Sequence, residues 1–405
     1  MKRFILILLA VLVVFAGVAT AVSVNQKPQE TAAPDTQVGA PISADAGEFT
    51  PATAEPIVIR TLDYDAIAAL HPADETVLSL GDESISWKEY CEWLGMNGRQ
   101  IEDYFSQMAS YYGIAADWEG SVGDGTGRNF ARYVVEETNA NLANILSYLS
   151  FAADRQVTLS EAEQAQLTDE GLAKGLLGEN ATAEELINQL ESDSFSIDTY
   201  RRICKTNLLL DRYYDDTYGP EGEKVSDEDA VAWLEGQNYV SAGHILFMTI
   251  DPNTGDKLDE AVIAEKRVQA ESIVSELRAI EDTAAREKRF LERKEELCED
   301  GGKRTYPEGY TYTPGTMVTE FESAVNELEP FEVSDPVESH YGYHVIMRLP
   351  LRPDSLLYSA QGTPSTARRE AAVEGMNRLL DEYIEAHPVV YAEGIEDLDV
   401  TKFIK

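Results

Sequence analysis

The 405-residue chain has few cysteines, and their spacing excludes several kinds of site. Cys91, Cys204 and Cys298 lie far apart, and no Cys-x-x-Cys pair occurs. This spacing indicates neither a zinc site nor a thioredoxin-like redox motif. An odd number of cysteines also excludes a fully paired set of intramolecular disulfides. Buried, idle thiols are the simplest interpretation, above all for Cys91 and Cys204, which lie in helical patterns.

Positive charge is also scarce. The chain has 33 Lys and Arg residues against 73 Asp and Glu residues, a net charge of −40. Such a charge repels nucleic acid and anionic lipid surfaces, so we expect no nucleic-acid partner. The acidity predicts a well-solvated surface. Electrostatic attraction of basic unfolded polypeptides is the sharper alternative, but it is unspecific, and we favour the solvated surface.

The N-terminus has the pattern of a targeting segment. Lys2 and Arg3 precede an apolar run from Phe4 to Val24, and Ala19-Thr20-Ala21 resembles a signal-peptidase site. The run is also long enough to span a bilayer, with its basic end in the cytoplasm. We therefore expect the rest of the chain to be exported, either released or tethered. Residues 25–56, rich in Pro, Ala and Thr, predict a flexible spacer.

The region from Val77 onward predicts two short strands joined by a Gly-Asp turn, followed by helices. Ser86 with Glu89 three residues later predicts a capping box at the first long helix. Two more pairs mark helix starts in the same way: Ser160 with Glu163, and Thr182 with Glu185. Apolar spacing predicts longer helices over about 129–153, 197–214 and 260–297. A last helix, over about 367–386, is predicted to have one apolar face, made of Val373, Met376, Leu379, Leu380 and Tyr383.

Four motifs follow one another in the second half of the chain. They are YVSAGHILF (Tyr239–Phe247), CED (Cys298–Asp300), GTMVTEFESAVNEL (Gly315–Leu328) and DPVESHYGYHVIMRL (Asp335–Leu349). Their order resembles parvulin-type (PpiC, or rotamase) peptidyl-prolyl isomerases. More weakly, GDESISWKEY (Gly81–Tyr90) resembles the opening of the helical chaperone domain of exported PrsA- and SurA-type foldases.

The resemblance implies an α+β fold, with a parvulin-like domain beside a mostly α-helical, chaperone-like domain. The parvulin-like domain has an antiparallel sheet of about four strands with surrounding helices. The implied segments are a signal peptide or membrane anchor at 1–24, a linker at 25–56, a helical domain at 57–224, an isomerase domain at 225–352, and a C-terminal helix and tail at 353–405 that pack on the helical domain.

The reaction that the resemblance implies is rotation about an X-Pro amide, whose barrier is about 18–20 kcal/mol. No bond breaks, so we expect neither a metal nor a cofactor. The site must hold proline in an apolar pocket and exclude water. By resemblance, the catalytic residues are His244, Asp300, Ser339 and His344, and the substrate-binding residues are Tyr312, Met317 and Phe321.

The implied roles differ among these residues. The two histidines orient a hydrogen-bond network that Ser339 joins, and Asp300 favours a weakened C–N double bond electrostatically. Met317 and Phe321, four residues apart, are predicted to share one helix face. Core packing is the plain alternative for this pair. A shift of the alignment would exchange Asp300 with Cys298.

Two further features bear on the assignment. His340 and His344 suggest a rival metal site, but no third ligand is evident. Gly309 occupies the place where the family has a pocket leucine, which weakens the expected activity unless Tyr310 substitutes for it.

The sequence thus predicts an extracytoplasmic foldase, membrane-anchored by its N-terminal segment or secreted. It would hold unfolded exported proteins and isomerise their X-Pro bonds. The alternatives are a non-catalytic chaperone with a degenerate parvulin domain and a scaffold for one dedicated partner. Dimers occur among related foldases, so a homodimer is compatible with the resemblance, but no interface is specified.

Overall fold

The computed structural model describes residues 57–359 and 364–405. The predicted anchor at 1–24 and linker at 25–56 lie outside the described residues. Across the described ranges, no helix is long and apolar enough to cross a membrane. These described residues form two compact units, one within Met1–Tyr213 together with Leu380–Lys405 and one within Tyr214–Leu379. The predicted domain boundaries at 224/225 and 352/353 stay predictions.

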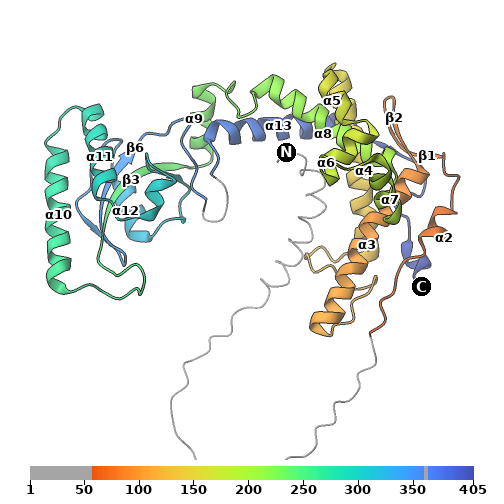
Figure 1. The fold of residues 1–405 in the computed structure, drawn as a ribbon, viewed down its shortest axis with the longest axis horizontal. Helices are drawn as coiled ribbons and strands as arrows, with labels where there is room; N and C mark the ends of the chain where they lie inside the picture. The colour runs from red at the N-terminus through yellow and green to blue at the C-terminus, as the bar shows by residue number, and fades with distance from the viewer. Residues whose placement is uncertain (1–56, 360–363) are drawn as a thin grey trace, which may run out of the picture. The chain divides into compact units, whose positions relative to one another are not determined.

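The first unit is mostly helical (Figure 1). Its elements are α2 (Tyr64–Ala68), β1 (Thr76–Leu80), β2 (Glu83–Ser86), α3 (Trp87–Tyr112), α4 (Phe130–Asp154), α5 (Glu161–Gln166), α6 (Asp169–Leu177), α7 (Ala183–Ser192), α8 (Ile197–Tyr218, which ends in the second unit), β7 (Val390–Tyr391) and η2 (Val400–Phe403).

The helix starts of this unit follow their N-cap residues. Ser160 and Thr182 form complete capping boxes at α5 and α7, as predicted. At α3 the prediction is half wrong, because Ser86 accepts the Glu89 N–H but no reciprocal bond forms. The Glu89 carboxylate is buried and instead faces the Arg202 guanidinium of α8 at 3.3 Å.

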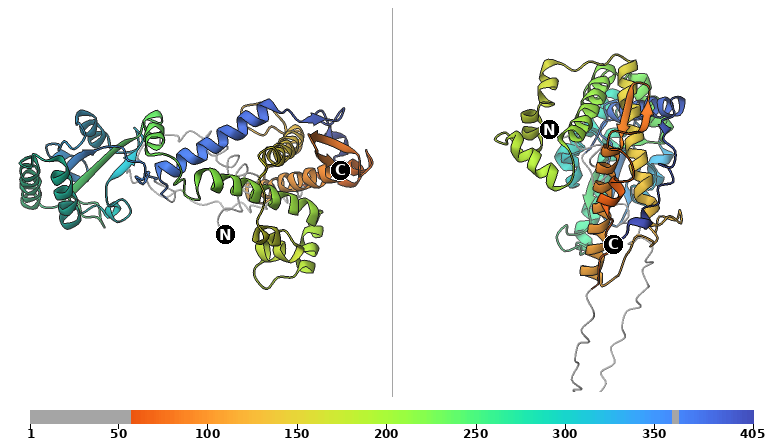
Figure 2. Two further views of the ribbon diagram at one scale, coloured as in Figure 1. Left: turned by 90° about the horizontal axis from the view of Figure 1, so that it is seen from above. Right: turned by 90° about the vertical axis from the view of Figure 1, so that its right-hand side faces the viewer.

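The C-terminal tail completes the first unit. β7 pairs antiparallel with β1, giving the strand order β2-β1-β7. Further along, Ile395 and Val400 enter the hydrophobic core built around α3 and α4. Lys405 exchanges two backbone hydrogen bonds with Thr61, so the C-terminus lies beside the orange-red segment that leads into α2 (Figure 2).

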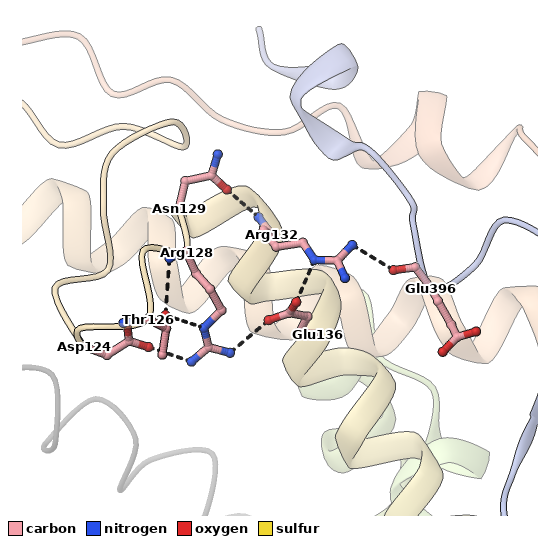
Figure 3. A network of polar contacts seen from close by, with 7 residues as sticks. All are labelled: Asp124, Thr126, Arg128, Asn129, Arg132, Glu136 and Glu396. Carbon is pink, nitrogen blue, oxygen red and sulfur yellow. Dashed lines mark hydrogen bonds and ion pairs between the residues drawn. The ribbon is translucent and has the colours of Figure 1, made fainter.

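Polar contacts also fix the tail to α4 (Figure 3). Arg132 donates to the Glu396 carbonyl at 3.0 Å and to the Glu136 carboxylate at 2.6 Å. Glu136 in turn pairs with Arg128, whose guanidinium also contacts Asp124 in the loop before α4. The loop before α4, the start of the helix and the tail are therefore held together by one network of side chains.

The second unit contains the four-stranded sheet (Figure 1). Its elements are α9 (Asp227–Gly236), β3 (Val240–Met248), α10 (Glu260–Arg278), α11 (Thr283–Leu297), η1 (Gly301–Arg304), β4 (Tyr310–Tyr312), α12 (Thr319–Glu327), β5 (Val337–Glu338), β6 (Gly342–Leu349) and α13 (Ala367–Ala386, which ends in the first unit).

All pairs in this sheet are antiparallel, with strand order β4-β3-β6-β5. The predicted α+β class is thereby confirmed. Side chains alternate between the two faces of a strand. Ile245 of β3 packs with α10 and α11 on one face, whereas Ala242 packs with Phe321 of α12 on the other. This alternation decides which residues can meet at a site.

The prediction of one helix over 260–297 is wrong. α10 ends at Arg278, and α11 begins after Asp282, whose carboxylate accepts the Ala285 N–H at 2.8 Å. The Arg286 guanidinium holds the intervening turn by donating to the Ile280 carbonyl. α11 also contributes to the core, because Phe290 is fully buried against Gly243 of β3.

The predicted apolar face of α13 is correct except at one position. Val373 is exposed, and its neighbour Ala372 is buried instead. Met376, Leu380 and Tyr383 continue that buried face at helical spacing.

Candidate active site

Two histidines meet on the α12 face of the sheet. In the register of β3 and β6, Leu246 lies opposite His344 and His244 lies opposite Ile346. The two histidines are therefore diagonal neighbours on one face. Their Nδ1 atoms are 2.9 Å apart and both side chains are buried.

Asp300 joins this pair from the segment after α11. Its Oδ2 atom lies 2.9 Å from His244 Nε2 and accepts the Tyr310 hydroxyl at 2.5 Å. Its Oδ1 atom accepts the Gly302 N–H at 2.9 Å. Cys298 lies elsewhere, since its thiol accepts the Leu246 N–H. The structure therefore brings Asp300, and not Cys298, to the histidines.

Ser339 lies at the other end of the row, with its Oγ 2.7 Å from His344 Nε2. It starts a tight turn in which the Ser339 N–H and the Gly342 carbonyl are hydrogen-bonded at 2.9 Å. A Cβ at Gly342 would lie 2.1 Å from the Phe247 carbonyl oxygen, so this turn requires glycine. The turn thus fixes the hydroxyl beside His344.

One assignment of protons satisfies the whole row. If His244 Nε2–H donates to the Asp300 carboxylate, His244 Nδ1 is an acceptor when the ring is neutral. His344 Nδ1–H then donates to it, and Ser339 donates to His344 Nε2.

The surroundings of His344 favour its uncharged form. Burial, together with the nearby His244, lowers the pKa of His344 to about 3. Burial alone would raise the pKa of Asp300, but the hydrogen bonds from His244, Tyr310 and Gly302 outweigh it and hold that pKa well below its usual range. The site therefore presents an ionised carboxylate beside an uncharged His344.

Apolar side chains cover the histidines. The Phe321 ring lies 5.5 Å from the His244 ring and 6.0 Å from the His344 ring. Tyr312, fully buried on β4, lies 6.1 Å from Phe321. Met317 packs against the same cluster and is only half-buried. The structure thus brings all seven predicted site residues into one region of the second unit.

The predicted shared helix face of Met317 and Phe321 is wrong, because α12 begins only at Thr319. Met317 lies in the turn before the helix. The Glu322 carboxylate reaches back and accepts the Met317 N–H at 2.8 Å and the Gly315 N–H at 2.9 Å. This contact fixes the turn and keeps Met317 beside Phe321.

The loop that departs from the family pattern has its own geometry. Gly309 has φ of +142°, and a Cβ there would lie 2.8 Å from the Ala242 carbonyl oxygen. A leucine is therefore excluded from this position. Tyr310, the next residue, packs 5.7 Å from the His244 ring.

Sequence reasoning missed Lys294. This lysine is 2 % exposed, and its ammonium donates to the Tyr306 and Pro307 carbonyls at 2.7 and 2.9 Å. It thereby holds the loop that leads to Tyr310. A lysine within a charged helix gives no sign of this role in sequence. His340 is exposed and its ring lies on Tyr341.

A cavity of about 240 Å³ lies on the other face of the sheet. Its lining includes Ser241, Thr311 and Leu349, which are direct partners in the strand register. Because Ser241 is three residues before His244 on β3, the two side chains point to opposite faces. This cavity is therefore separate from the histidine site.

Comparison with known proteins gives the class of this domain. Residues 244–349 match the rotamase family, described as the PPIC-type PPIASE domain. Foldase protein PrsA 3 of Bacillus cereus is 28% identical over 195 residues, which cover 41% of this chain and 65% of that protein. Foldase protein PrsA of Clostridium perfringens is 23% identical over 280 residues, covering 67% of this chain and 71% of that protein.

Among solved structures, that of the peptidylprolyl isomerase PrsA from Bacillus cereus covers 82% of this chain and 98% of its own, at 17% identity and a TM-score of 0.28. The match of residues 244–349 to the rotamase family shows that the second unit contains a parvulin-type peptidyl-prolyl isomerase domain. The chain that carries it is related in sequence to the PrsA foldases, and it spans 65% of the length of the Bacillus cereus relative.

Proposed function

We propose that this protein is an extracytoplasmic foldase whose parvulin-type domain isomerises X-Pro bonds in unfolded polypeptides. The hydrogen-bonded row Asp300–His244–His344–Ser339 beneath Met317 and Phe321 is the observation that carries the proposal. The row lies in the segment that matches the rotamase family.

The arrangement suits rotation about an amide. Met317 and Phe321 offer an apolar surface for the proline ring, and a water-poor environment weakens the planar, charge-separated form of the amide. The ionised Asp300 supplies a fixed negative charge at the edge of that surface. Electrostatic stabilisation of the twisted amide by preorganised groups needs no covalent step.

The histidines act by position in this proposal. A buried His344 whose pKa is lowered to about 3 is neutral at pH 7 and is a poor proton donor for catalysis. Its two ring nitrogens are both occupied, by His244 and by Ser339. We therefore assign the imidazoles to holding Asp300 and the floor of the pocket in place.

The cellular setting belongs to the proposal as well. The basic and apolar pattern of residues 1–24 supports export, with the segment acting as anchor or signal peptide. We propose that the helical unit holds unfolded exported clients while the parvulin-type domain acts on them. Homodimer formation stays a prediction from the resemblance.

A refolding assay tests both activities together. The substrate is a denatured protein whose slow refolding phase is limited by prolyl isomerisation. We expect the parent protein to accelerate this phase, and Asp300→Ala to abolish the acceleration while suppression of aggregation persists. His340→Ala, which changes an exposed histidine beside the site, is the matched control and should behave as the parent.

The geometry of Gly309 favours a second candidate, a peptide-binding chaperone without isomerase activity. The position cannot hold the leucine that completes the family's pocket, so less apolar surface meets proline. This candidate predicts suppression of aggregation without acceleration of the slow phase, in the parent and in Asp300→Ala alike.

A further inference from the structure

Tyr310 makes a contact that the proposed mechanism has not used. Its hydroxyl donates to Asp300 Oδ2, the same oxygen that faces His244 Nε2. Oδ1 accepts the Gly302 N–H. An ionised carboxylate offers about four acceptor positions. Three are occupied, which leaves one position on Oδ1.

We propose that Tyr310 is a positioning residue of the isomerase site, whose phenol fixes the Asp300 carboxylate against His244 and keeps it charged. This inference rests on the proposed function for its catalytic consequence. The contact between Tyr310 and Asp300 can itself be tested without an isomerase assay.

Gly302 leaves room for the contact between the Tyr310 hydroxyl and Asp300. A Cβ at Gly302 would lie 2.0 Å from the Tyr310 hydroxyl oxygen, so only glycine leaves room for the phenol. Residue 302 has no positive φ that would by itself demand glycine. Because residue 302 has no side chain, the Tyr310 hydroxyl and the Gly302 N–H can both reach the Asp300 carboxylate.

Other aromatic residues hold the Tyr310 ring. The Tyr306 ring lies 5.0 Å away and the Tyr358 ring 5.5 Å away. Tyr358 lies beyond residue 349, where the family match ends, and its N–H donates to the Thr311 carbonyl at 2.7 Å. The segment after β6 thus runs along β4 and adds a ring that supports Tyr310.

Several charged and titratable groups lie around Asp300, including Glu299, Lys303 and Arg304 on its own segment. His244 and Tyr310 contact it directly, while Lys294, Cys298 and His344 act on it through space. Tyr310 remains protonated, because burial and the carboxylate both raise the pKa of its hydroxyl. It therefore acts as a permanent donor to Asp300.

Three variants of the full-length protein test the proposal. Tyr310→Phe removes only the hydroxyl. Tyr306→Phe is the matched control, because its hydroxyl accepts the Ser359 N–H in the same aromatic cluster. Gly302→Ala should displace the phenol, because the added methyl group would lie 2.0 Å from the Tyr310 hydroxyl oxygen and 3.1 Å from its Cζ.

The first readout is the titration of the Asp300 carboxyl carbon by NMR. We expect the parent carboxyl to stay ionised down to the acid limit of the folded state. In Tyr310→Phe and Gly302→Ala it should begin to protonate at distinctly higher pH, and in Tyr306→Phe it should follow the parent. Identical titration in the parent and Tyr310→Phe would overturn the proposal, as would an equal shift in Tyr306→Phe.

The second readout is kcat/KM for prolyl isomerisation as a function of pH. One hydrogen bond to a charged group corresponds to about a tenfold change. We expect Tyr310→Phe to lower kcat by about that factor, with KM little changed, and to move the acid limb upward in pH. If the parent shows no isomerase activity, the proposed function fails, but the carboxyl titration still decides the role of Tyr310.

Discussion

The burial of His344 makes the stability of the native protein depend on pH. The unfolded chain protonates it near pH 6.5, whereas the native site keeps it neutral down to about pH 3. Between these values the unfolded state binds more protons, so the free energy of unfolding falls as pH falls. The loss amounts to at most about 1.4 kcal/mol per pH unit for this one group.

We therefore predict that His344→Gln reduces this slope between pH 6.5 and 4.5. Urea unfolding of both proteins across this range measures it. Glu89, whose pKa burial raises to about 7, contributes with the opposite sign in both proteins and cancels in the difference. An unchanged slope in the variant would mean that native His344 titrates normally.

Close packing around Gly243 leaves no room for a side chain at this position. A Cβ at this position would lie 2.6 Å from the Phe290 ring, which is fully buried. We predict that Gly243→Ala destabilises the second unit by about 1–3 kcal/mol, the usual cost of overpacking. Thermal unfolding measures this loss.

Gly236→Ala, at the end of α9, is the control for Gly243→Ala. No atom lies within 4 Å of the added methyl group, and alanine favours helix. The control should be neutral or slightly stabilising. Equal stability of Gly243→Ala and Gly236→Ala would contradict the prediction, because it would show that the Phe290 ring moves aside without a loss of stability.

The site shows which residue roles a sequence can reveal. The motif order predicted His244, Asp300, Ser339 and His344, since each lies in or beside a short recognisable pattern. Tyr310 and Lys294 were not predicted in their observed roles. Their contacts depend on the path of the loop over residues 300–309, which no local pattern specifies.

At the scale of elements, the break between α10 and α11 depends on one cap. Asp282 accepts the Ala285 N–H and starts α11, whereas Asp259 stands at the N-cap of α10 without a side-chain bond. We predict that Asp282→Ala costs about 1 kcal/mol and that Asp259→Ala costs clearly less. Urea unfolding of the two variants compares them, and equal losses would refute the assigned cap.

The same break shows why helix ends are harder to predict than helices. Residues 260–297 contain no glycine or proline, and their charged residues favour helix throughout. The capping boxes of α5 and α7 were predictable because both partners lie within four residues. The missing half of the Ser86 box was not, since Glu89 turns to Arg202 of a distant helix.

At the scale of the whole molecule, the C-terminal tail completes the sheet and the core of the first unit. β7 pairs with β1, and Ile395 and Val400 are about 1% exposed in its core. This pairing is not local, so the sequence predicted only a tail that packs on the helical domain.

We predict that Ile395→Ala destabilises the first unit by about 2–5 kcal/mol. Deletion of residues 389–405 should unfold that unit, while NMR signals of His244 and His344 persist, because the second unit has its own core. Amide hydrogen exchange, resolved by residue, measures both effects. Glu393→Ala, on an exposed tail position, is the control, and equal protection in the deleted and full-length proteins would contradict the tail's role.

The measurement that tests the central claim most directly is exchange NMR on a short peptide containing one X-Pro bond. The cis and trans forms give separate signals, and their interconversion takes tens of seconds or more without a catalyst. The proposed site predicts exchange cross-peaks on the sub-second timescale with the parent protein and their loss with Asp300→Ala. Peptide binding by the parent without accelerated exchange would contradict the isomerase assignment and leave a peptide-binding chaperone.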